Sequence, residues 1–169
     1  MIHKLDKTIH YGKKTIQMAG CIPESMILLL ARLGMGGIFW RSGMTKITLE
    51  QDAANFTLDQ FLQVITLKWQ VSDFTYVLFE SDYDVPVLPP ELAAHMALLA
   101  ELTLPVLLLI GLASRLSALA MLGMTAVIQT FVYPGLWPDH SLWAAALLLL
   151  IAKGSGKISV DHLIARKLK

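Results

Sequence analysis

Four long apolar stretches, separated by polar turns and one long polar connection, organise this sequence. They cover about residues 22–43, 92–112, 116–133 and 138–153. All are longer than ordinary strands, and three approach the ~20 apolar residues that carry a helix across ~30 Å of hydrocarbon. The fourth stretch is the shortest, so its helix must begin near Trp137 or the bilayer must thin around it. The pattern predicts an all-α protein, a transmembrane four-helix bundle.

The connection between the first two stretches carries a different pattern. Thr57 and Gln60 have the spacing of a capping box, and the apolar residues that follow recur on one helical face. We interpret this segment as a short amphipathic helix in the long first outer loop, lying on the membrane or over the bundle. For residues 74–90, where aromatic, acidic and proline residues mix, we expect an ordered loop without a long helix.

Composition supports a membrane protein and excludes several other classes. Hydrophobic residues make up 55% of the chain and charged residues 16%, whereas a soluble domain carries about 25% charged residues. No run of Lys and Arg interleaved with aromatic residues is present, so nucleic acid is not an expected partner. Cys21 is the only cysteine, so the chain forms neither an internal disulfide nor a CxxC redox pair.

The basic residues predict the orientation in the membrane. They gather in the N-terminal tail, in the turn after the second stretch and in the C-terminal tail: Lys4, Lys7, Lys13, Lys14, Arg115, Lys153, Lys157, Arg166, Lys167 and Lys169. With four spans these three regions share one side, which the positive-inside rule makes the cytoplasm. Both termini are therefore expected in the cytoplasm, with the long acidic connection outside.

Arg32 and Glu101 are charged residues inside apolar stretches, where each needs a partner. Counted from the predicted cytoplasmic ends of their helices, both lie ~15 Å deep, so we expect them to pair. The pair would serve either to fix the register of the helices or as the polar floor of a ligand site or proton path. Gln129 lies ~20 Å deep by the same count and would extend this cluster outward.

A second polar group is expected at the outer mouth of the bundle. Its members are Arg41, Ser42, Lys46, Glu91, His95, Asp139 and His140. His95 and His140 lie at the rim within reach of water, so we expect hydrogen bonding there rather than a haem or a metal. An anion or a quinone head-group held by Arg41 and one of the histidines is the favoured ligand.

Several motifs together resemble the DoxX family of small bacterial membrane proteins. They begin with Arg32-Leu33-Gly34, Phe39-Trp40-Arg41-Ser42-Gly43 with Lys46, Val85-Pro86-Val87-Leu88-Pro89-Pro90-Glu91-Leu92-Ala93-Ala94, and Ala100-Glu101-Leu102. They continue with Gly111-Leu112-Ala113-Ser114-Arg115-Leu116, Phe131-Val132-Tyr133-Pro134 with Trp137-Pro138 and His140, and Gly154-Ser155-Gly156-Lys157-Ile158-Ser159-Val160-Asp161. The resemblance implies a four-helix bundle in the inner membrane, over one domain that covers the chain.

The same resemblance implies a redox association, because the family is named after a subunit of a thiosulfate:quinone oxidoreductase. Our leading hypothesis is therefore a subunit of a quinone-linked oxidoreductase system, with quinone as its ligand and soluble or membrane redox proteins as partners. The alternatives are a non-enzymatic scaffold or anchor for other proteins, and a membrane protein that binds a small molecule or lipid. Formation of a homo-oligomer stays open.

Overall fold

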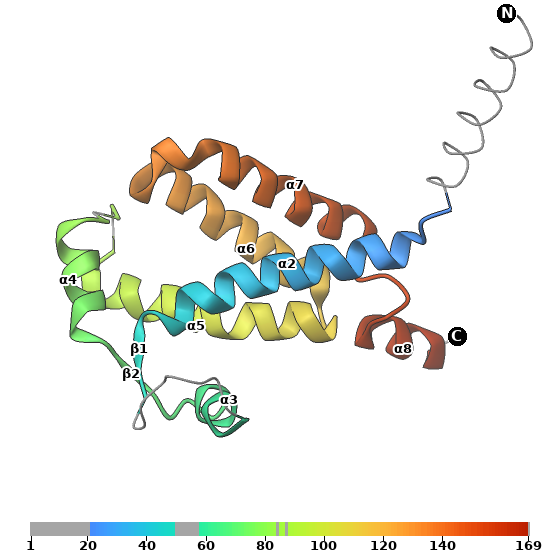
Figure 1. The fold of residues 1–169 in the computed structure, drawn as a ribbon, viewed down its shortest axis with the longest axis horizontal. Coiled ribbons are helices and arrows are strands. Elements are labelled where there is room, and N and C mark those ends of the chain that lie inside the picture. The colour runs from blue at the N-terminus through green and yellow to red at the C-terminus, as the bar shows by residue number, and fades with distance from the viewer. Residues whose placement is uncertain (1–20, 50–57, 84, 87, 169) are drawn as a thin grey trace, which may run out of the picture.

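The structure is a computed structural model that describes residues 21–49, 58–83, 85–86 and 88–168. Its main body is a bundle of four helices, α2 (Glu24–Met44), α5 (Pro90–Ile110), α6 (Ser114–Val127) and α7 (Trp137–Lys153). α2 packs against α5 and α7, and α6 packs against the same two helices, so the four close into a ring (Figure 1). The core residues are Leu28, Met35, Phe39, Leu108, Ala118, Met121, Leu147 and Leu150. The predicted four-helix bundle is confirmed.

Three segments of the described chain are long and apolar enough to cross a membrane: Pro90–Ile110, Ser114–Val132 and Pro134–Lys153. A 3-10 turn at Pro134–Leu136 precedes α7 and lengthens the stretch that looked shortest, with α7 itself beginning at Trp137 as expected. α2 is 21 residues long, as α5 is, but it includes Arg32 and Arg41. It is not among the three candidate spans. That α2 is a fourth span therefore stays a prediction.

The connection between α2 and α5 folds as a small cap beside the bundle. A two-residue strand, β1 (Ile47–Thr48), pairs antiparallel with β2 (Gln70–Val71) and closes the loop between them. Inside that loop lies α3 (Leu58–Ile65), which confirms the expected short amphipathic helix, although Thr57 of the capping box lies outside the described residues. α3 buries Val64 and packs Phe61 against Trp40 of α2, whereas Leu58, Leu62 and Ile65 stay exposed.

A further short helix, α4 (Asp73–Ser81), occupies part of the segment expected to be a loop. The side chain of Ser72 accepts a hydrogen bond from the backbone N–H of Thr75 at 3.2 Å, which caps the start of the helix. α4 packs against α5, where Phe79 is buried. This helix was missed because its nine residues are too few to show a clear helical period.

The C-terminal segment folds back under the bundle instead of trailing from it. The C-cap of α7 is Gly154, whose φ of 82° lies in the left-handed region that favours glycine. The chain then turns into α8 (Val160–Lys167), which lies near the end of α5 in Figure 1. The backbone N–H of Asp161 donates to the carbonyl of Gly111 at 2.9 Å and ties α8 to the turn between α5 and α6.

Candidate functional site

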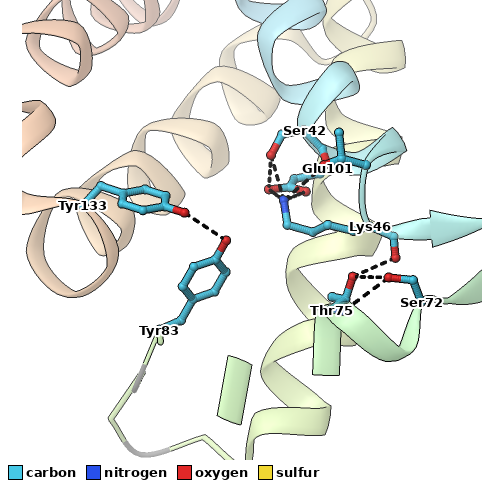
Figure 2. Close-up of polar contacts among 8 residues, drawn as sticks. Ser42, Lys46, Ser72, Thr75, Tyr83, Glu101 and Tyr133 are labelled. Carbon is cyan, nitrogen blue, oxygen red and sulfur yellow. Dashed lines mark hydrogen bonds and ion pairs between the residues drawn. The ribbon is translucent and has the colours of Figure 1, made fainter. Parts of the chain in front are cut away.

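Glu101 forms a buried ion pair with Lys46 (Figure 2). The Lys46 Nζ lies 2.7 Å from one Glu101 oxygen and 2.9 Å from the other, and it also donates to the Ser42 Oγ at 2.7 Å. The Ser42 hydroxyl in turn donates to the Glu101 Oε1 at 3.1 Å. All three ammonium protons therefore have acceptors, and the charges of Lys46 and Glu101 neutralise each other.

Local sequence brings these groups together. Ser42 lies in the last turn of α2, and Lys46 follows in the turn just after the helix, where its side chain reaches back to the Ser42 hydroxyl. A Cβ placed on Gly43 would lie 2.8 Å from a Leu102 methyl carbon and 3.1 Å from the Glu101 Cβ, so only glycine allows α5 this close. The Thr75 hydroxyl donates to the Lys46 carbonyl at 3.0 Å and holds α4 against the same corner.

The prediction that Arg32 pairs with Glu101 is wrong. The buried Arg32 guanidinium donates instead to backbone carbonyls: those of Leu108 at 2.7 Å, Ser155 at 3.1 Å and Ile158 at 2.6 Å, together with that of Leu109. Arg32 thereby donates to two carbonyls at the C-terminal end of α5, of which that of Leu108 also accepts the N–H of the C-cap residue Gly111, and it anchors the C-terminal segment.

The predicted pairing was wrong because two residues at the same count from the predicted ends of their helices need not lie at the same depth. Gly43 of α2 lies against Glu101, and Gly36 lies against Leu109, which sets the antiparallel register of α2 and α5. In that register Glu101 is level with the last turn of α2, whereas Arg32 is about three turns away. The first two turns of α2 extend beyond the end of α5 and contact the residues after α7 (Figure 1).

The Lys46–Glu101 pair forms part of the wall of a cavity of about 420 Å³ in the half of the bundle that holds the C-terminal end of α2. Most of the lining is apolar and comes from α2, α5, α6 and α7, including Ile38, Phe39, Leu104, Met124 and Trp143. The polar lining residues are Ser42, Lys46, Tyr83, Glu101, Tyr133 and His140. This combination of apolar walls with a few polar groups is typical of a site for a small organic ligand.

Gln129, expected beside Arg32 and Glu101, instead contacts His140, which was expected in the outer group. His140 is 4% exposed, and its Nδ1 lies 2.6 Å from the Gln129 Oε1. The Gln129 Nε2 donates to the carbonyl of Pro134 at 2.8 Å. Gln129 lies in the π-helical turn Ile128–Val132 that ends α6, and His140 lies in the first turn of α7. The contact therefore joins two helices beside the cavity.

Two tyrosines also border the cavity, and sequence reasoning missed them as ligand-binding candidates. The hydroxyls of Tyr83 and Tyr133 lie 3.4 Å apart, with the rings packed edge to face at 5.9 Å (Figure 2). Burial raises the pKa of Tyr83, and the hydrogen bond to Tyr133 raises it further, so the hydroxyl stays protonated at neutral pH. The only signal was their aromatic character, which does not distinguish a ligand-binding side chain from a packing one.

Arg41 and His95 do not line the cavity. Both are exposed, and His95 contacts the Glu91 carbonyl at 2.8 Å and the Tyr76 hydroxyl at 3.4 Å on the outer side of α5. The expected outer group therefore divides: Ser42, Lys46 and His140 reach the cavity, whereas Arg41, Glu91, His95 and Asp139 remain on the surface. Within the described ranges, no three His, Cys, Asp or Glu side chains gather in a metal-binding arrangement.

Comparison with known proteins places the chain in a family. A family model described as DoxX matches residues 27–134, which is more than half of the 169 residues. Neither a curated protein nor a solved structure gives a significant match. The matched region contains Arg32, the Lys46–Glu101 pair and Gln129, and its fold includes helices apolar enough to cross a bilayer. The chain is therefore a membrane protein of the DoxX family.

Proposed function

We propose that the protein is an integral membrane subunit of a quinone-linked redox system and that it binds the ring of a quinone in the cavity beside Glu101. The observation that carries the proposal is the cavity itself: a volume of about 420 Å³, mostly apolar walls, and polar groups at its edge. Such walls suit a flat, lipid-soluble ring and its tail, and the polar groups would orient the ring oxygens.

The electrostatics of the cavity favour a neutral ligand. Lys46 and Glu101 neutralise each other, and the three ammonium protons are already bound, so the pair offers no uncompensated charge to an anion. The tyrosine pair, in contrast, can donate a hydrogen bond to a ligand. When one hydroxyl of Tyr83 and Tyr133 donates to the other, one phenolic proton remains for a ligand oxygen. A neutral ring bearing oxygen atoms fits these groups better than a carboxylate or phosphate does.

The proposal includes a membrane orientation. We place α2 across the bilayer as the fourth span, with both termini in the cytoplasm of a bacterial cell and the bundle in the inner membrane. This is supported by Arg115, Lys153 and Lys157, which all line a second hollow at the opposite end of the bundle from Glu101. The cavity then opens in the outer half of the membrane, close to the β1–β2 connection and α4. Electrons would come from a partner protein, soluble or membrane-bound, that carries its own redox centre.

The quinone content of purified protein tests this function. The protein is extracted in mild detergent from membranes that contain quinone, and its organic extract is compared with that of an unrelated membrane protein purified in the same way. We expect close to one quinone per chain above the level of the unrelated protein. A protein that carries no excess quinone and binds no added short-tailed quinone would contradict the proposal.

A second function, an anchor for partner proteins, is favoured by the apolar surface of the cap. Leu58, Leu62 and Ile65 on α3 and Phe74 and Val77 on α4 are all 45% exposed or more. These faces would contact either the membrane surface or another protein. The same purification separates the two functions, because an anchor would retain a stoichiometric partner protein without excess quinone.

A further inference from the structure

The orientation of the Gln129 side-chain amide is fixed by its two partners. Its Nε2 lies 2.8 Å from the carbonyl oxygen of Pro134, and a carbonyl oxygen accepts hydrogen bonds but cannot donate them. The amide nitrogen must therefore face Pro134. The opposite side of the amide, the Oε1, then faces His140, where it lies 2.6 Å from the Nδ1.

This arrangement determines the tautomer of His140. Because the Gln129 Oε1 is only an acceptor, the Nδ1 of His140 must carry the proton that joins them. In a neutral imidazole the other nitrogen, Nε2, is then unprotonated and presents a lone pair. Within the part of the chain that the structure describes, no group donates a hydrogen bond to this Nε2.

The unprotonated edge of the ring faces the cavity. His140 lines the cavity whereas Gln129 does not, so the Nδ1 edge is directed away from it and the Nε2 edge is left toward it. The ring of Trp143, which also lines the cavity, packs edge to face on the imidazole at 4.9 Å and restricts its rotation. The cavity therefore contains one oriented hydrogen-bond acceptor on a buried imidazole ring.

We infer that the Nε2 of His140 accepts a hydrogen bond from a ring hydroxyl, so that the site prefers the reduced, hydroquinone form of its ligand over the oxidised quinone. The inference rests on the proposed function and names the ligand form at the same site. A hydroquinone can donate one hydroxyl to His140, and its second oxygen can accept the remaining proton of the Tyr83–Tyr133 pair. A quinone has only acceptor oxygens, and one of them would face the Nε2 lone pair without a proton between them.

Anaerobic calorimetry on the detergent-solubilised protein tests this preference. A short-tailed benzohydroquinone and the corresponding benzoquinone are titrated separately in mildly alkaline buffer, which keeps imidazoles neutral. The two probes have nearly the same size and shape, so the comparison isolates the hydroxyl protons. We expect the hydroquinone to bind about tenfold more tightly, the effect of one buried hydrogen bond gained in place of an unsatisfied acceptor.

Two variants and one control assign the preference to His140. His140→Phe keeps an aromatic ring beside Trp143 but removes the acceptor, so both probes should bind with similar affinity. Gln129→Leu leaves His140 in place but releases the Nδ1, which allows the other tautomer and should also reduce the preference. His95→Phe changes an exposed histidine outside the cavity and should keep the full preference.

The outcomes separate this inference from the proposed function. If both probes bind the wild-type protein equally, or if the preference survives both His140→Phe and Gln129→Leu, the inference is overturned while quinone binding stands. If neither probe binds the wild-type protein, the proposed function fails and the inference fails with it. Since Gln129→Leu tests the same tautomer without changing His140, loss of folding in one variant still leaves a decisive measurement.

Discussion

Arg32 and Glu101 show two ways in which a charged side chain is accommodated inside an apolar bundle. The Arg32 guanidinium is surrounded by backbone carbonyls from the end of α5 and from the C-terminal segment, so the backbone replaces water around the charge. Glu101 instead has a cation and a hydroxyl as partners. Arg32 therefore has a structural role at one end of the bundle, and Glu101 belongs to the cavity at the other.

The sequence singles out both charged residues but cannot identify their partners. Partner choice depends on the register of α2 and α5, which close contacts at Gly36 and Gly43 set to within one helical turn. Apolar periodicity does not contain that information, because it marks where a helix lies in the chain and not how far it extends beyond its neighbour. The sequence assigned Gln129 and His140 to two different groups, although the structure joins them, and Tyr83 and Tyr133 carried no distinguishing signal.

Substitution of Arg32 should loosen the C-terminal segment. Arg32→Gln removes the charge and leaves several of the four carbonyls without a donor, which should cost about 2 kcal/mol or more. We expect a lower thermal midpoint in detergent and faster proteolysis after residue 153. Arg41→Gln, an equivalent change at an exposed position, should alter neither property. Equal effects of both variants would show that Arg32 does not anchor this segment.

A comparison with a double variant tests whether Lys46 and Glu101 neutralise each other. Lys46→Met leaves a buried carboxylate without its cation and should cost about 3 kcal/mol of stability. When Glu101→Leu is added, the unpaired charge disappears and most of the loss should be recovered. Thermal unfolding of the three proteins in detergent gives the comparison. A double variant as unstable as Lys46→Met alone would contradict a mutually neutralised pair.

At the scale of elements, the sequence predicts the long helices and the amphipathic α3 but not the short helix α4. The bundle helices follow from extended apolar stretches, and α5 continues through Pro105 even though proline lacks the N–H that an interior position normally uses. α4 and the two-residue strands β1 and β2 depend on Ser72, on Thr75 and on contacts with the bundle. Such contacts lie between residues far apart in the chain, where local patterns carry no information.

The carboxylate of Asp161 helps to hold α8 against the start of α6, which makes the docking of α8 sensitive to acid. Both Asp161 oxygens accept backbone hydrogen bonds at the start of α6, from the N–H of Ala113 at 2.8 Å and of Ser114 at 3.0 Å. Burial by itself would raise the pKa of Asp161, but these hydrogen bonds from Ser114 and Ala113 outweigh it, so the pKa lies below its ordinary value. The stabilisation is therefore present above the ordinary aspartate pKa and is lost as the pH falls through the lowered value.

Asp161→Asn should remove this acid-sensitive contribution. At neutral pH we expect the variant to lose about 1 kcal/mol, as for other helix caps, and the difference from wild type should shrink below about pH 4. The thermal midpoint of both proteins, measured across that range, gives the result. Glu80→Gln, at an exposed position on α4, is the matched control and should show no such pH-dependent difference. A difference that persists unchanged into acid would contradict the assignment to Asp161.

For the whole molecule, the position of α2 decides how the cavity is presented to the membrane. Three segments satisfy the length and apolarity of a span, and α2 packs between two of them, α5 and α7. Charge lowers the apolarity of α2, but Arg32, in the middle of the helix, is buried inside the protein rather than exposed to lipid, and Arg41 lies in the last turn. Sequence statistics judge every side chain as though lipid surrounded it, so they undervalue a helix whose central charge faces its neighbours.

Chemical labelling tests whether α2 crosses the membrane. Cys21, the only cysteine, is exposed just before α2, so a membrane-impermeant maleimide should label it in inside-out vesicles and not in intact spheroplasts. In a Cys21→Ser, Gly135→Cys variant the new thiol would stand in open space between α6 and α7, and the pattern should reverse. Labelling of both positions from the same side would contradict a spanning α2.

The most direct test of quinone binding is to fill the cavity. Ala100 lines the cavity on α5, so Ala100→Trp should block the space for a ring, whereas Ala126→Trp places the same side chain on an exposed surface of α6. Calorimetric titration of a short-tailed hydroquinone compares the two variants with wild type after both are shown to fold. We predict that Ala100→Trp abolishes measurable binding and that Ala126→Trp binds as the wild type does. Unchanged binding by a folded Ala100→Trp protein would contradict a quinone site in this cavity.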